Sequence, residues 1–292
     1  MIDITNKDFG VSKAIHSPID KQITANLTNK LSDYVQSTDQ SNISIEKRKN
    51  KLWEVCQQQV RKYLEPVVDL SEFKYAYPTN GIHESIDCFL AKTKHYQVFT
   101  GEYRYPTILK QPNHVADNVI DLIPHMPLYM SNPFSATGNF DKRYDEVGIR
   151  LQCPIYLDLA FVGTTAEHKI EMYENVQQVF WSCSKPYGLN LLRSGIRFSR
   201  KEEPLQKEIQ GAGYFNPAII DVFNQVTQHS SVFAKSQQYK SVQEKICKQF
   251  DLTPSDSYLV ATTQNSEWDR FKRENGVNRV CLTPAYEIIL NK

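Results

Sequence analysis

Two residues with the chemistry of a cofactor site, Lys185 and Arg193, lie eight positions apart in this sequence. Lys185 closes the run Ser182-Cys183-Ser184-Lys185, which follows an apolar stretch. A lysine amine forms an imine with an aldehyde when it is held where it can lose its proton. An arginine holds a phosphate through two parallel hydrogen bonds. These residues indicate a cofactor site, and the alternative is an exposed lysine and arginine in a surface loop.

An aspartate stands at the end of another apolar stretch. Asp158 lies in Tyr156-Leu157-Asp158-Leu159-Ala160-Phe161, and the carboxyl ends of strands are where α/β sheets bind ligands. A carboxylate buried there is costly unless a cation pairs with it. The protonated nitrogen of a pyridine ring is such a cation. The alternative is an aspartate that caps the helix after the strand.

Two turns add weaker signals. Asn80-Gly81-Ile82-His83 opens a predicted helix, and backbone N–H groups at a helix N-terminus bind phosphate well. The run from Ser131 to Gly138 is rich in Asn, Pro, Ser and Gly, which is typical of a turn. Each of these segments could equally be a turn without a ligand.

In their order and approximate spacing, these segments together resemble the fold-type I enzymes that use pyridoxal 5'-phosphate (PLP). Within that group they resemble the class I/II aminotransferase superfamily, of which this chain would be a short and divergent member. The resemblance covers about residues 80–283 and includes the closing motif Arg279-Val280-Cys281-Leu282. It implies a PLP-dependent aminotransferase, acting on an amino acid and a 2-oxo acid, with no metal.

The resemblance also implies roles for individual residues. Lys185 would carry PLP as a Schiff base and move the proton of the substrate Cα, and Asp158 would pair with the pyridine nitrogen. Tyr103 would stack on the ring, and Arg279 would bind the substrate α-carboxylate; the alternatives are a core tyrosine and an exposed arginine on an edge strand. The phosphate and its surroundings would be held by Gly81, Ile82, His83, Ser182, Ser184 and Arg193.

Two positions depart from the family pattern. Ser135 replaces an asparagine, and Phe161 replaces a tyrosine, that in the family donate hydrogen bonds to the phenolic oxygen of the cofactor. Fewer donors should raise the pKa of the lysine–cofactor imine. Three interpretations therefore stay open: an aminotransferase, a PLP-dependent lyase, decarboxylase or oxidase on the same scaffold, and a degenerate homologue that is not a catalyst.

The composition limits the other function classes. The chain has 292 residues and a formal net charge of +1, so it offers no general attraction to nucleic acid or to anionic membranes. It contains no run of apolar residues long enough for a membrane span and no basic, apolar start of a secretory signal. Six scattered cysteines without CxxC spacing are typical of a reduced, cytoplasmic protein. A homodimer is implied by the resemblance alone.

The elements that would position these residues are short apolar strands alternating with helical patterns, which predicts an α/β fold with a mainly parallel sheet flanked by helices. We expect an N-terminal arm (1–44), a large PLP-binding domain (45–200) and a small C-terminal α+β domain (201–292). Predicted helices cover 20–36, 45–65, 82–90, 140–150, much of 203–250 and 266–275. Predicted strands cover 73–77, 96–100, 127–130, 154–159, 176–182, 257–261 and 278–283.

Overall fold

The computed structural model describes residues 4–9, 15–27, 42–150 and 153–290. A sheet with strand order β1-β7-β6-β5-β4-β2-β3 forms its centre. Strand β7 runs antiparallel to both of its neighbours, and the other pairs are parallel. The strands are β1 (Tyr75–Thr79), β2 (Gln97–Phe99), β3 (His114–Ala116), β4 (Leu128–Ser131), β5 (Ile155–Asp158), β6 (Val176–Trp181) and β7 (Gly195–Ser199).

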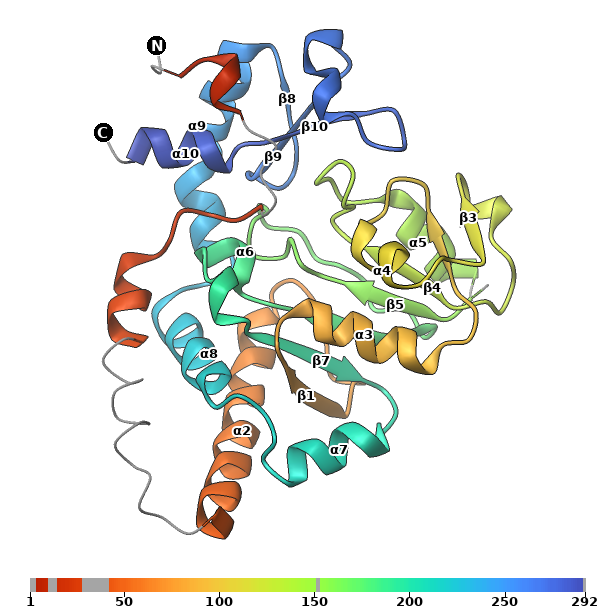
Figure 1. The fold of residues 1–292 in the computed structure, drawn as a ribbon, viewed down its shortest axis with the longest axis vertical. Coiled ribbons are helices and arrows are strands. Elements are labelled where there is room, and N and C mark those ends of the chain that lie inside the picture. Colours follow the sequence, from red (N-terminus) through yellow and green to blue (C-terminus); the bar gives the residue numbers. More distant parts are fainter. Residues whose placement is uncertain (1–3, 10–14, 28–41, 151–152, 291–292) are drawn as a thin grey trace.

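Helices cover both faces of this sheet (Figure 1). Helices α2 and α8 pack on one face, where Trp181 of β6 stacks on Phe223 of α8 with their ring centroids 5.5 Å apart. Helix α3 covers the opposite face. The helices around the sheet are α2 (Asn42–Leu64), α3 (Ile82–Lys92), α4 (Arg104–Leu109), α5 (Lys142–Arg150), α6 (Ser184–Tyr187), α7 (Pro204–Gly211) and α8 (Ala218–His229).

Alternation along the central strands explains these two layers. In β4, Leu128 and Met130 belong to the core on the α2–α8 side, while Tyr129 between them packs with Phe89 of α3. Successive side chains of a strand point to opposite faces, so a strand covered on both sides must be apolar throughout. This explains why β4 and β5 are apolar up to their last residues and why β6 ends in the apolar run Val179-Phe180-Trp181.

A second, smaller sheet with strand order β10-β9-β8 lies beyond the carboxyl ends of the large sheet (Figure 1). Its core includes Phe9, whose ring meets Trp268 edge-on with centroids 5.4 Å apart. The elements here are α9 (Ala234–Phe250), β8 (Thr253–Pro254), β9 (Val260–Thr263), the 3-10 helix η4 (Ser266–Phe271), β10 (Asn278–Cys281) and α10 (Thr283–Leu290).

The mainly parallel α/β fold is as predicted, but several elements differ in place or type. The strand predicted at 257–261 lies at Val260–Thr263, the helix predicted at 266–275 is a short 3-10 helix, and the last predicted strand ends at Cys281. In the predicted helix 20–36, residues 21–27 are helical and the rest lies outside the described residues. Strand β7 and helix α10 were not predicted.

The predicted domain limits at residues 44 and 200 stay predictions. Helix α8 lies after residue 200, yet its residues Ile219, Phe223 and Val226 belong to the core of the large sheet. The early residues Ile4 and Phe9 belong instead to the core of the small sheet. We therefore propose that the large domain extends through α8 and that the small domain begins with α9. No helix within the described ranges is long and apolar enough to cross a membrane.

Candidate active site

A cavity of about 210 Å³ lies where β4, β5 and β6 end and the small sheet approaches them. The carboxyl ends of parallel strands are where ligands bind in open α/β sheets. Every residue predicted for the site lines this cavity except Gly81, which lies behind Arg193. The lining residues are Ile15, Ile82, His83, Tyr103, Ser131, Ser135, Asp158, Ala160, Phe161, Ser182, Ser184, Lys185, Asn190, Arg193 and Arg279.

Lys185 lies in the single turn α6, directly after β6. Its Nζ is 5.1 Å from the ring centroid of Phe161. Burial, together with the positive charges of Arg279 and Arg193, lowers the pKa of Lys185, and the negative charge of Asp158 opposes this shift. A lysine with a lowered pKa is a free amine at a lower pH than usual, so it is a better nucleophile and base near neutrality.

Asp158 is the last residue of β5 and is almost fully buried. Its Oδ2 accepts a hydrogen bond of 2.6 Å from the hydroxyl of Tyr129, and its Oδ1 accepts one of 2.7 Å from the backbone N–H of Ala160. Burial raises the pKa of Asp158, while these hydrogen bonds and the charge of Lys185 lower it. Each oxygen keeps room for a further partner, and a cation in the cavity would offset the cost of burying the charge.

The approach of Arg193 to the start of α3 depends on a glycine. Gly81 precedes α3 with a φ of 77°, and a Cβ added there would lie only 2.7 Å from Nη2 of Arg193. Arg193 itself has a φ of 50° and donates to the carbonyl oxygens of Asn80, at 3.2 Å, and Asn190, at 3.3 Å. Glycine adopts positive φ freely and leaves space for close neighbours, so this turn can hold a guanidinium against a helix N-terminus.

The hydroxyl of Ser184 supplies the test of whether a phosphate suits this turn. Among the described residues its buried Oγ has no hydrogen-bonding partner, and it lines the cavity together with Ser182 and Arg193. A buried hydroxyl is normally hydrogen-bonded. A phosphate oxygen would supply the missing acceptor beside a cation that is always charged, so the residues present fit a phosphate group.

His83 connects Arg193 with Tyr103 through its two ring nitrogens. Nη2 of Arg193 lies 3.3 Å from Nδ1 of His83, and the hydroxyl of Tyr103 lies 2.7 Å from Nε2. A guanidinium can only donate, so Nδ1 must accept and the proton is on Nε2. Burial and the charges of Arg193 and Lys185 lower the pKa of His83, which favours this neutral form. The hydroxyl proton of Tyr103 is therefore left to donate elsewhere.

Arg279 reaches the cavity from β10 of the small sheet. Its Nη1 donates a hydrogen bond of 2.6 Å to the backbone carbonyl of Ser135. Burial, with the charge of Arg273, lowers the pKa of Arg279 to about 10, which still leaves the guanidinium charged near neutrality. One carbonyl occupies one of its five N–H groups, so others are available for a carboxylate.

Residues 15–17, which precede the helical residues 21–27, contact both α6 and α10. The N–H of Ser17 donates a hydrogen bond of 2.7 Å to the carbonyl of Lys185. The neighbouring His16 accepts a 2.6 Å hydrogen bond from the hydroxyl of Thr283, which begins α10. Ile15 then lines the cavity. This stretch brings the cavity an apolar wall that was not predicted from the sequence.

Several other contacts of the site were missed. Ser131, Ala160 and Asn190 line the cavity, and Tyr129 donates to Asp158 from the neighbouring strand. The strand register pairs Ser131 with Asp158, which places Tyr129 on the same face two residues earlier. Alternation along β4 was visible in the sequence, but the register between the strands was not.

Comparisons with known proteins find solved structures that share this fold. The chain aligns with histidinol-phosphate aminotransferase from Sinorhizobium meliloti, solved with pyridoxal-5'-phosphate, with a TM-score of 0.66 and 14% identity over 95% of this chain and 90% of that one. It aligns with L-threonine-O-3-phosphate decarboxylase from Porphyromonas gingivalis with a TM-score of 0.64 and 13% identity, over 96% and 98% of the two chains.

A third similar structure is the PLP-bound C-S lyase from Staphylococcus hominis, with a TM-score of 0.63 and 9% identity over 80% of each chain. No model of a protein family matches the chain, and no curated protein matches its sequence. The chain thus has the fold of these PLP-dependent transferases and lyases, as the resemblance implied. At such low identity, the comparisons show the fold only, and the reaction has to be inferred from the residues of the site.

Proposed function

We propose that this protein is a PLP-dependent aminotransferase that moves an amino group between an amino acid and a 2-oxo acid. The observation that carries the proposal is the convergence of Lys185, Asp158, Arg193 and Arg279 on one cavity. They come from α6, β5, the loop before β7, and β10. Each is a residue type that a different part of PLP or of an amino acid would need.

In this proposal the chain holds the cofactor at both ends of the cavity. Arg193, Ser182, Ser184 and the N–H groups at the start of α3 bind its phosphate. Asp158 would pair with the ring nitrogen and favour a proton on it. Bound in this way, PLP supplies an electron-withdrawing ring that stabilises negative charge at the substrate Cα.

Lys185 then has two roles. Its amine would hold the cofactor, and its Nζ, when free, would carry the proton to and from the substrate Cα. The lowered pKa of Lys185 suits this second role, because a base must be unprotonated at the working pH. Asp158 limits the shift, since its negative charge favours the ammonium form.

Arg279 would orient the substrate by binding its α-carboxylate. We expect Arg279→Lys to raise the KM for amino-acid substrates roughly a hundredfold, because a lysine cannot form the planar pair of bonds. Steady-state kinetics with a panel of amino acids measures this effect. An unchanged KM would contradict the assignment. Lys272→Arg, at an exposed position that does not line the cavity, is the control for a change of cation type.

The proposal is tested by adding PLP to the purified protein and recording its absorbance with and without amino acids. We expect a visible band that an amino-acid substrate converts to one at shorter wavelength, and that a 2-oxo acid restores. Reduction with borohydride, followed by peptide mass spectrometry, should find the cofactor on Lys185. A protein that gains no band after PLP is added would contradict the whole proposal.

The matched control for the lysine is Lys49. Burial lowers its pKa as well, but it bonds to the carbonyls of Gly213 and Phe215 and does not line the cavity. Lys49→Ala should keep both the band and the label, whereas Lys185→Ala should lose the label. A covalent label that persists in Lys185→Ala would move the role to another lysine.

A decarboxylase or lyase reaction is the second candidate. Ser135 and Phe161 stand where the family places an asparagine and a tyrosine, and the ring of Phe161 faces Lys185 without a hydroxyl. The chain also matches a decarboxylase over nearly the full length of both proteins. Release of CO₂ without formation of a 2-oxo acid from the substrate would favour this candidate. For either reaction we expect a homodimer, which sedimentation analysis of the purified protein would test.

A further inference from the structure

A second buried carboxylate, Glu102, lies behind the cavity and outside the residues assigned to the cofactor. It follows β2, and only 3% of its surface is exposed. It does not line the cavity, whereas its neighbour Tyr103 does. A buried carboxylate needs hydrogen bonds or a cation, so the groups that bind Glu102 indicate its role.

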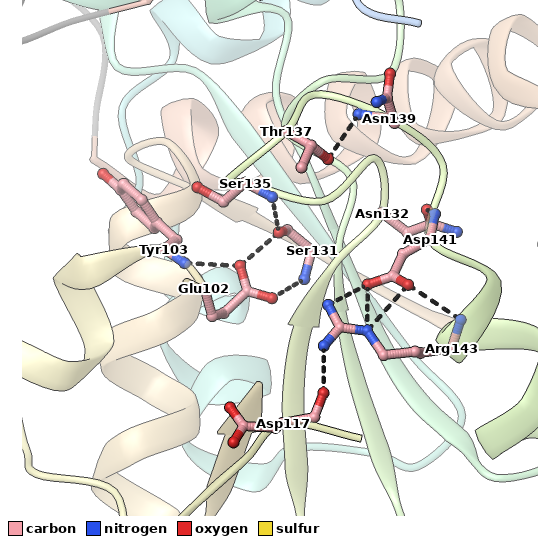
Figure 2. A network of polar contacts seen from close by, with 10 residues as sticks. All are labelled: Glu102, Tyr103, Asp117, Ser131, Asn132, Ser135, Thr137, Asn139, Asp141 and Arg143. Atoms are coloured by element: carbon pink, nitrogen blue, oxygen red, sulfur yellow. Dashed lines mark hydrogen bonds and ion pairs between the residues drawn. The ribbon is translucent and has the colours of Figure 1, made fainter. Parts of the chain in front are cut away.

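Three donors converge on this carboxylate (Figure 2). Oε1 accepts the N–H of Tyr103 at 2.7 Å and the hydroxyl of Ser131, and Oε2 accepts the N–H of Ser131 at 2.8 Å. The hydroxyl of Ser131 also accepts the N–H of Ser135 at 2.8 Å, so its own proton points at Glu102. Glu102 is the acceptor at every contact, which is the behaviour of an ionised carboxylate.

These contacts join the two sides of the proposed site. Tyr103 is the aromatic assigned to the ring face, and it is fixed at its backbone by Glu102. Ser135 is fixed through the hydroxyl of Ser131, and its carbonyl in turn accepts from Arg279 at 2.6 Å. One carboxylate thus sets the backbone that carries the stacking residue and the backbone that orients the substrate arginine.

The surroundings make this charge sensitive to pH. Burial, and to a smaller degree the charge of Asp158, raises the pKa of Glu102 to about 7, against the three hydrogen bonds that lower it. The ionisable groups around it are Asp158 on β5, Tyr129 on β4, Arg273 after η4, and Glu274, which lines a neighbouring cavity together with Glu102. Of these only Arg273 is a cation, so the hydrogen bonds carry most of the stabilisation.

We propose that Glu102, as an ionised carboxylate, is a positioning residue that holds Tyr103 against the cofactor ring and Ser135 against Arg279. The proposal rests on the proposed function, because it assumes that PLP occupies the cavity. Loss of the charge leaves a carboxyl or amide group with a proton facing a donor. An amide nitrogen accepts no hydrogen bond, so Glu102→Gln loses at least one of the three contacts, and a protonated carboxyl weakens the contact at its hydroxyl oxygen. The residues beyond that contact are then less well fixed.

The test compares Glu102→Gln with Glu146→Gln, a control at a partly exposed position of α5 that pairs with Arg150. The dissociation constant of PLP is measured by titrating apoprotein between about pH 6 and pH 8. We expect Glu102→Gln to weaken binding about tenfold above the pKa of Glu102. As the pH falls through about 7, the tighter PLP binding of the wild type and of Glu146→Gln relative to Glu102→Gln should disappear. Ionisation of the phosphate and of Lys185 is shared by all three proteins, so the difference between profiles isolates Glu102.

A readout without cofactor separates this proposal from the proposed function. Hydrogen exchange in apoprotein should be faster in Glu102→Gln at the amides of Tyr103, Ser131 and Ser135, and unchanged in Glu146→Gln. If wild type binds no PLP, the proposed function fails whatever the exchange shows. If wild type binds PLP and Glu102→Gln has the same affinity, pH profile and exchange, the positioning role is wrong.

Should Glu102→Gln not fold, Ser131→Ala tests the same connection with the charge retained. It removes the hydroxyl between Glu102 and Ser135 but keeps the N–H bonds from Tyr103 and Ser131. We expect faster exchange at Ser135 and a higher KM for the amino acid, with the affinity for PLP little changed. Equal effects on PLP and substrate, or no effect on either, would overturn the proposal.

Discussion

The two buried carboxylates beside the cavity, Asp158 and Glu102, differ in what their oxygens contact. Asp158 accepts one hydrogen bond on each oxygen and faces the cavity. Glu102 accepts three from its own neighbours and lies behind it. Asp158 lines the cavity and keeps acceptor sites free for a ligand, whereas Glu102 lies outside the cavity and most of its acceptor sites serve donors of the fold. The difference separates a group suited to chemistry from a group suited to support.

The strongest way to break this comparison is Asp158→Asn. An amide cannot keep a proton on the ring nitrogen, so we expect the rate of amino transfer to fall at least roughly a thousandfold while the protein still folds. Single-turnover kinetics followed by absorbance, with circular dichroism as the check on folding, measures both. A loss of less than tenfold would place Asp158 with Glu102 among the supporting residues.

Tyr129→Phe sharpens the comparison by removing the hydroxyl that Asp158 uses on the side away from the cavity. The lost bond is short, at 2.6 Å, and both residues are buried. We expect a loss of about 1–3 kcal/mol in the free energy of unfolding and a rate reduced about tenfold. Urea denaturation and steady-state kinetics measure the two effects. Tyr105→Phe, which removes a more exposed hydroxyl bonded to Asp87, is the control.

Glu102 should affect the pH dependence of the free energy of unfolding more than the rate of the chemical step. Its pKa in the folded protein is about 7, above the ordinary value of 4.5, so the folded state retains a proton that the unfolded state has lost. The stability it confers is complete below the unfolded pKa and declines as the pH rises through about 7. Between about pH 4.5 and pH 8, the free energy of unfolding of wild-type apoprotein should fall by up to about 3 kcal/mol, and that of Glu102→Gln should not show this fall. Parallel pH profiles in urea denaturation would contradict this.

The smallest effect is expected from Phe161→Tyr, which restores a hydroxyl on the side of Lys185. If that hydroxyl donates to the phenolic oxygen of the cofactor, the anion is favoured. The pH at which the visible band changes should then fall by about one unit or less. A spectral pH titration of wild type, Phe161→Tyr and Ser135→Asn measures it. A transition at the same pH in all three would mean that other groups set the electronics of the ring.

The residues of the cavity could be predicted from the sequence more readily than the strands and helices around them. Lys185 and Asp158 follow apolar runs whose strands, β6 and β5, are buried on both faces, so local pattern and chemistry agree. Strand β7 follows Arg193, and nothing local shows that it enters the sheet antiparallel between β1 and β6. Placing it requires the pairing of distant strands, which composition does not encode.

The role of Glu102 could not be predicted from the sequence for the same reason, because it depends on the pairing of distant strands. It stands next to Tyr103 in a turn, where a charged residue is ordinary, and only the pairing of β2 with β4 brings Ser131 to it. A carboxylate held by backbone N–H groups has no partner of opposite charge to search for in the sequence. Its role follows from which amides converge on it, and that is a property of the tertiary structure.

The stretch that includes His16 and Ser17 has a mechanical consequence. It is hydrogen-bonded to Thr283 at the start of α10 and to the carbonyl of Lys185 in α6. Any displacement of the small sheet that carries α10 must therefore break one of these bonds or pull on the backbone of α6. A force on one unit is transmitted along this short tether to the residue that would carry the cofactor, so opening the cavity and moving its lysine are coupled displacements.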